Sequence, residues 1–221
     1  MLKRPPGGLL SICFSISLAR GSQVDNVTIS FLEKSDVSEA ARVLSMAMAH
    51  NPINLAVYQG GGESERKAIE EAYREILASP RGILFAARVN RDLVGVMRMI
   101  SCDGGENVYE DVKTEDFQDT RWRKSFWHRE WDRHDPAQQH WHLGPVAVLP
   151  DYQGKRIGTA LMNRFCREVD ACFAAAYLET DGTQNVSFYR KFGFEVIGKS
   201  DIFQVPNHYM WRPAIRRNEA S

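Results

Sequence analysis

Residues 149–161 read LPDYQGKRIGTAL, and this stretch decides the fold. It follows an apolar run typical of a strand, turns at a Pro-Asp pair and leads into an apolar helical segment. The N-terminus of a helix carries unpaired N–H groups and about half a positive charge, so it attracts phosphate. Gly154 and Gly158 leave the backbone open to a ligand, and Lys155 and Arg156 add mobile charge. Taken alone, the stretch fits a phosphate site and an ordinary strand-to-helix turn equally well.

Alternating and helical hydrophobic patterns extend in both directions from this turn. Neither GxxxxGK[ST] nor GxGxxG fits the turn itself. We predict the element order β-α-α-β-β-insertion-β-α-β-α-β-β. A capping box of Asp36 with Glu39 is expected to begin the first helix. The predicted strands are 27–32, 82–89, 93–100, 140–149, 175–180, 194–200 and 208–212, and the predicted helices are 37–48, 64–78, 157–173 and 186–192.

Length and composition fit one globular domain with short extensions. The chain has 221 residues, 43% of them hydrophobic and 25% charged, and its formal net charge is zero. That balance gives no overall field for nucleic acid, and no apolar run approaches the length of a membrane span. We expect a leader at 1–25, a domain at 26–215 with an insertion at 103–139, and a tail at 216–221. The leader reads either as an unstructured segment or as a short secretory signal.

The four cysteines form no CxxC pair, which favours buried reduced thiols over a disulfide framework or a zinc site. Reduced thiols favour a reducing compartment. The expected location is therefore cytoplasmic, with export by the leader as the alternative.

Two motifs together resemble the GNAT superfamily of N-acetyltransferases. VAVLPDYQGKRIGTAL (146–161) resembles the family's acetyl-CoA motif, Gln/Arg-x-x-Gly-x-Gly/Ala, with Gln153 and Gly158 at its first and last positions. Arg156 stands where the middle glycine is usual. NVSFYRKFGF (185–194) resembles the later signature N-x-x-x-Y-x-x-x-G-F. The resemblance covers about residues 27–213 and leaves out the leader and most of the insertion.

The resemblance implies an α/β (α+β) fold, a mixed, twisted sheet of about seven strands flanked by helices and splayed between the fourth and fifth strands. Acetyl-CoA as co-substrate would lie in that gap. Pro145 points the same way independently, because a proline cannot donate in a central ladder and marks a bulge or an unpaired edge. The implied coenzyme-binding residues are Val146, Ala147, Val148, Gln153, Gly154, Lys155, Arg156, Ile157, Gly158, Thr159, Asn185 and Tyr189.

The implied reaction is direct attack of a primary amine on the thioester. His142 is the candidate general base, since an ordinary imidazole pKa near 6.5 suits proton removal. Tyr189 is the candidate acid for the departing thiolate. The alternatives are a structural histidine, a tyrosine that only packs on the coenzyme, and Asn185 as a helix cap. A metal site of His140 with His142 lacks an evident third ligand, so no metal is expected.

The resemblance also implies that the insertion and residues 50–63 form the side of the cleft that binds the acceptor amine. Trp122, Trp127 and Trp131 recur at helical spacing, either as a packing stripe or as a pocket wall for an aromatic or cationic amine. A small molecule or a protein could supply the amine. Neither nucleic acid nor membrane is an expected partner, and the family resemblance allows a homodimer. The rival functions are a non-catalytic acyl-CoA-binding module and a nucleotide-binding protein.

Overall fold

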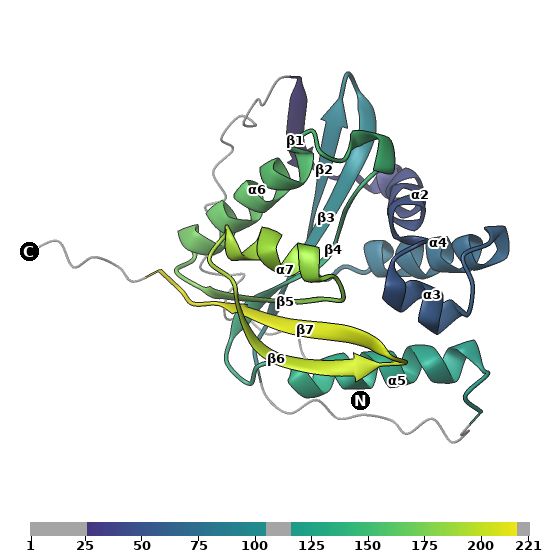
Figure 1. Ribbon diagram of the computed structural model, residues 1–221. Coiled ribbons are helices and arrows are strands. Elements are labelled where there is room, and N and C mark those ends of the chain that lie inside the picture. Colours follow the sequence, from purple (N-terminus) through teal and green to yellow (C-terminus); the bar gives the residue numbers. More distant parts are fainter. Residues whose placement is uncertain (1–25, 105–115, 216–221) are drawn as a thin grey trace, which may run out of the picture.

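A seven-stranded sheet in the order β1-β2-β3-β4-β5-β7-β6 organises the molecule (Figure 1). The computed structural model describes residues 26–104 and 116–215. All neighbouring strands are antiparallel except β4 and β5, which are parallel. The predicted mixed sheet of an α/β protein is therefore confirmed. The strands are β1 (Val27–Phe31), β2 (Ile83–Val89), β3 (Asp92–Cys102), β4 (His140–Val148), β5 (Ala175–Thr180), β6 (Glu195–Ile202) and β7 (Val205–Arg212).

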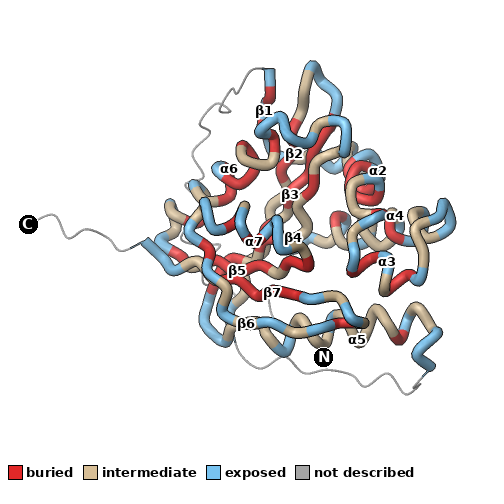
Figure 2. Tube along the Cα trace, in the orientation of Figure 1, coloured by how far each residue is buried: buried red, intermediate tan, exposed pale blue. Residues whose placement is uncertain are grey.

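Helices pack on both faces of the sheet (Figure 1). On one face, α6 and α7 cover a core that includes Phe85, Met97 and Phe165. On the other, α2 and α4 cover Leu44 and Val96. The buried residues therefore form two layers with the sheet between them, as Figure 2 shows. The helices are α2 (Val37–Met48), α3 (Pro52–Tyr58), α4 (Glu63–Ala78), α5 (Thr120–His134), α6 (Ile157–Ala171) and α7 (Thr183–Arg190).

The sheet opens between β4 and β5, as the family resemblance implies. These strands pair only where residues 140–142 of β4 face residues 175–177 of β5. Beyond His142, β4 continues to Val148 with β3 as its partner on one side. The β3–β4 register shifts between Met97 and Met99, opposite Pro145. The proline therefore marks a bulge, as expected, and the rest of β4 has no strand partner on the β5 side.

Local details differ from the expectations at three points. The predicted capping box is wrong, because the Asp36 side chain makes no cap hydrogen bond and instead pairs with Arg88 of β2 at 2.5 Å. Residues 50–63 were not predicted to be helical, yet they contain α3, which begins after Asn51 accepts hydrogen bonds from two backbone N–H groups. Helix α7 begins at Thr183, three residues before the predicted start.

Cys102 and Cys166 are free thiols, whereas Cys172 is disulfide-bonded, which corrects the expectation for that residue. Within the described residues, no helix combines the length and the apolar character needed to span a membrane. The predicted leader (1–25), part of the insertion (105–115) and the tail (216–221) lie outside the described residues.

Candidate active site

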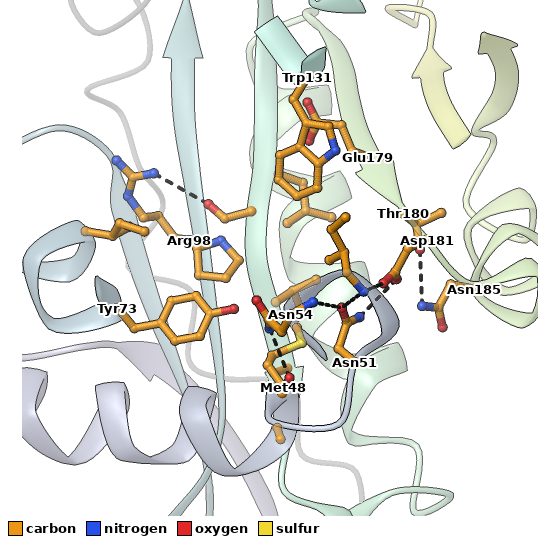
Figure 3. Close-up of a pocket in the computed structure, with 18 of the residues that line it drawn as sticks. Met48, Asn51, Asn54, Tyr73, Arg98, Trp131, Glu179, Thr180, Asp181 and Asn185 are labelled. Carbon is orange, nitrogen blue, oxygen red and sulfur yellow. Dashed lines mark hydrogen bonds between the residues drawn. The ribbon is translucent and has the colours of Figure 1, made fainter. Parts of the chain in front are cut away.

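A cavity of about 1030 Å³ opens where β4 and β5 separate. Residues 142–148 of β4 form one side, and Glu179, Thr180 and Asp181 form the other. Strand β3 and helices α2, α3, α4, α5 and α7 contribute most of the remaining wall. Figure 3 shows side chains from these separate elements around the cavity.

The loop before α6 adopts the left-handed backbone that such a turn requires. Gly154 has φ 74° and Arg156, the N-cap of α6, has φ 62°. The N–H groups of the first turn of α6 have no intrahelical acceptor, so they are available to an anion. No atom lies within 4 Å of the position that a Cβ on Gly154 would occupy, so the loop is open on that side. The turn thus has the geometry of a phosphate site.

The coenzyme-binding residues predicted from the sequence divide into two groups. The Gln153 side chain donates to the Val148 carbonyl at 3.0 Å and ties the loop to the end of β4. Ile157 is 1% exposed, so its side chain belongs to the core and only its backbone can face a ligand. Val146, Ala147, Val148, Gln153, Gly158, Asn185 and Tyr189 line the cavity, whereas Gly154, Lys155, Arg156, Ile157 and Thr159 form the adjoining turn.

His142 is paired with Glu179, a residue that the sequence did not reveal. The His142 Nε2 lies 2.7 Å from a Glu179 carboxylate oxygen across the β4–β5 gap. Their side chains are 20% and 4% exposed. Burial lowers the pKa of His142, but the Glu179 charge and hydrogen bonds to Glu179 and Cys102 raise it well above its ordinary value. The site therefore favours the protonated imidazole, unlike the ordinary imidazole that the sequence suggested.

A second histidine pair lies at the start of β4. The His140 Nδ1 is 2.7 Å from the Gln138 carbonyl, and its Nε2 lies 3.1 Å from Asp135. Burial lowers the pKa of His140, but these contacts and the Cys102 thiol raise it to about 9.

No third metal ligand near His140 and His142 was evident from the sequence. Cys102, Asp135 and His142 in fact bring potential ligand atoms within 4.8 Å of one another. Because both histidines already face carboxylates, we assign these groups to ion pairs and hydrogen bonds.

Tyr189 lies on α7, one helical turn beyond Asn185, and both line the cavity. Burial, followed by the Asp181 charge, raises the pKa of Tyr189 above its ordinary value, so the phenol is protonated at all physiological pH values. Asn185 donates to the Thr180 hydroxyl at 3.1 Å, and Gly182 is the N-cap of α7. The alternative of Asn185 as the cap is therefore wrong.

Helix α5 carries the three tryptophans that the sequence proposed for the acceptor. Trp127 and Trp131 line the cavity and contact each other edge to face at 4.7 Å between ring centroids. The Trp131 indole N–H donates to Asn207 at 3.1 Å, which fixes its ring. Trp122 does not line the cavity and instead stacks on Phe126 at 5.3 Å. Helix α5 thus packs against the domain through Trp122 and lines the cavity through Trp127 and Trp131.

Helix α3 forms part of the cavity wall and was not anticipated. Asp181 accepts hydrogen bonds from the Asn51 side chain and from the Ile53 N–H, both at 2.9 Å, as Figure 3 shows around Asn51. This carboxylate therefore docks the N-terminus of α3 against the end of β5. A sequence signal for the contact did exist, since Asn51-Pro52 is a typical helix start.

A gap between parallel strands beside an open, left-handed turn at a helix start is the arrangement that the family resemblance implied. The model of the Acetyltransferase (GNAT) family matches residues 57–194, which is more than half of the chain. The chain belongs to the GNAT acetyltransferase family.

Solved structures of low sequence identity share the fold. Arylalkylamine N-acetyltransferase 2 from Aedes aegypti matches with a TM-score of 0.64 and 13% identity, over 87% of this chain and all of that one (100%). A histone acetyltransferase HPA2 and related acetyltransferase from Corynebacterium glutamicum matches with a TM-score of 0.63 and 19% identity, over 87% and 99% of the two chains. The ribosomal-protein-S18-alanine N-acetyltransferase from Escherichia coli gives 0.54 and 16%, over 88% and 98%.

Proposed function

We propose that the protein is an acetyl-CoA-dependent N-acetyltransferase that transfers the acetyl group directly to a primary amine. The observation that carries the proposal is the unpaired stretch of β4 after His142, which runs from the His142–Glu179 pair to the open start of α6. The coenzyme diphosphate would accept hydrogen bonds from the backbone N–H groups near residues 154–159. The pantetheine amides would pair with Val146–Val148, as an added strand would.

The chemistry requires two protons to leave the amine nitrogen and one proton to reach the thiolate. The bound ammonium first loses a proton, which costs about 4–5 kcal/mol at neutral pH for an ordinary alkyl amine. The deprotonated His142–Glu179 pair accepts that proton and releases it to solvent. The amine nitrogen then attacks the thioester carbon, so that a C–N bond forms and the C–S bond breaks.

The leaving thiolate takes a proton from the Tyr189 phenol. The attacking nitrogen still carries one excess proton, which returns to the phenolate and restores Tyr189. The net products are an amide, free coenzyme A thiol and one proton. Burial raises the pKa of a thiol as well as that of a phenol, so the raised pKa of Tyr189 does not by itself widen the gap between donor and acceptor.

The acceptor is expected to have an apolar or aromatic portion. Trp127 and Trp131 of α5 line the same cavity as His142. The name of the similar mosquito enzyme, an arylalkylamine N-acetyltransferase, supports an acceptor of this kind.

Thiol release from acetyl-CoA in the presence of a broad panel of amines and peptides tests the proposal. We expect release with at least one acceptor, and its loss in His142→Gln and Tyr189→Phe. Binding of acetyl-CoA without release for any acceptor would instead favour the non-catalytic acyl-CoA-binding module. Thermal stabilisation by ATP that acetyl-CoA cannot compete away would favour the nucleotide-binding alternative.

A further inference from the structure

Arg98 on β3 is a half-buried cation on the cavity wall that has no carboxylate partner among the described residues. Its Nη1 lies 3.5 Å from the Gly144 carbonyl and its Nη2 lies 3.3 Å from the Arg81 carbonyl, both at the long limit of hydrogen bonding. The Nε is buried and has no partner within the described part of the chain. A guanidinium offers five N–H donors, so most of its capacity is unused.

Three other buried or half-buried arginines of this protein face carboxylates, whereas Arg123 is held by two backbone carbonyls and the Phe203 ring. Arg212 makes two bonds with the Asp170 carboxylate, at 2.6 and 3.0 Å, and Arg88 contacts Asp36 at 2.5 Å. Arg164 contacts Glu168 at 2.5 Å. Burial of Arg98, by contrast, lowers its pKa, and the Cys102 thiol offsets only part of that effect. A half-buried charge without a counter-charge lowers the stability of the fold. The position of Arg98 therefore favours the binding of an anion.

Arg98 and the catalytic pair lie on either side of Gly144. The guanidinium reaches the Gly144 carbonyl, while the His142 Nε2 is 3.8 Å from the position that a Cβ on Gly144 would occupy. In Figure 3, Arg98 stands on one side of the cavity and Glu179 and Asp181 stand on the other. A ligand that spans the cavity can therefore place a positive group near the carboxylates and a negative group at Arg98.

We propose that Arg98 binds the carboxylate of the acceptor, so that the substrate is a small amino acid with a free amine and a free carboxylate. This inference rests on the proposed function. One guanidinium matches one carboxylate, which it can hold through two parallel hydrogen bonds. The same contact aims the amine at His142–Glu179, because the opposite orientation would place the carboxylate against Glu179. The Trp127 and Trp131 rings would receive an apolar side chain.

Matched acceptors test the inference. Each amino acid is compared with its carboxamide, which has the same shape and no negative charge, and with an amine that carries a phosphate. The carboxylate form is expected to have a kcat/KM about 10- to 100-fold above that of the carboxamide, the range of a buried charge-assisted hydrogen bond. In Arg98→Gln this ratio is expected to fall close to one, and Arg98→Lys should recover part of it. The control is Arg167→Gln, an exposed arginine of α6 outside the cavity, which should keep the wild-type ratio.

The possible outcomes distinguish a failure of the proposed function from a failure of the amino acid assignment alone. No thiol release with any amine, including uncharged ones, would overturn the proposed function. Release with a ratio near one in the wild type would overturn only the amino acid assignment. A higher KM for acetyl-CoA in Arg98→Gln, equal for all acceptors, would place Arg98 on the coenzyme and also overturn the assignment. A clear preference for the phosphate-bearing amine would keep the anion site but reject the carboxylate.

Discussion

One wall of the cleft is continuous backbone, whereas the opposite wall is assembled from side chains of distant segments. The wall that we propose for the coenzyme, called the coenzyme wall, comprises residues 143–159, the end of β4 and the loop into α6. The acceptor wall comprises α3, α5, Arg98, Glu179 and Asp181, which are spread over more than a hundred residues. A backbone site tolerates many side chains as long as its conformation holds. A side-chain site depends on each group separately, so substitutions should act differently on the two walls.

The largest effect is expected at Tyr189, where the two walls meet. Tyr189→Phe keeps the ring and its packing but removes the proton donor, so kcat should fall about 10²- to 10⁴-fold. Affinity for the coenzyme, measured by titration with coenzyme A, should change little. Tyr152→Phe, in the loop where Lys155 lies over the ring, is the control and should keep kcat. Wild-type kcat in Tyr189→Phe would remove the acid role.

The next largest effect is on the pH dependence of kcat/KM. It tests the role of Glu179, which belongs to the acceptor wall. The Glu179 charge helps to hold the pKa of His142 well above its ordinary value, so the base form of the imidazole appears at a higher pH than it does in an ordinary histidine. Glu179→Gln removes this charge while the opposing effect of burial remains, so the pKa falls. The acidic limb of kcat/KM against pH should therefore move to lower pH, by roughly 1–3 units.

The control for this shift is a more distant carboxylate on α5. The Asp132 charge also interacts with His142, without the 2.7 Å contact that Glu179 makes. Asp132→Asn should therefore move the limb in the same direction by a smaller amount. An unchanged limb in Glu179→Gln would show that the titrating base is a different group.

The same division between the walls explains what the sequence could predict. The coenzyme wall lies within two short motifs, and their local signals are strong. Two glycines and the helix start place the turn, and Pro145 marks the bulge. The mixed sheet and its splay between the fourth and fifth strands followed from the family resemblance, and the structure confirms both.

The acceptor wall could not be read in this way, because its contacts depend on tertiary packing. Glu179 on β5 reaches His142 only through the parallel pairing of two strands. Arg98 looks in sequence like any exposed strand residue, and its missing partner is visible only in space. The left-handed backbone at Arg156 was the one local feature of the coenzyme wall that remained uncertain.

Two tryptophans of α5 allow a smaller and sharper comparison. Trp127 lines the cavity and Trp122 does not, so the two Leu variants should give opposite results. Trp127→Leu should lower kcat/KM for the best acceptor about 10-fold, the cost of one aromatic contact, with little change in Tm. Trp122→Leu should lower Tm by about 5 °C and leave the acceptor KM unchanged. If Trp127→Leu had no effect for any acceptor, α5 would be a packing element only.

The smallest effect tests whether backbone or charge holds the coenzyme. Arg156 and Gly154 both adopt positive φ, which costs a non-glycine residue roughly 1–2 kcal/mol. Arg156→Gly should therefore raise Tm by about 2 °C, and Gly154→Ala should lower it by a similar amount, because no atom near Gly154 would clash with the new methyl group.

Arg156→Gly should also weaken coenzyme A binding, but only about 5-fold, since an exposed cation contributes about 1 kcal/mol to such a contact. Higher stability with slightly weaker binding would show that the amides of the loop hold most of the diphosphate. A loss of binding of 100-fold or more would instead assign that role to the guanidinium, and the coenzyme wall would then depend on a single side chain, as the acceptor wall does.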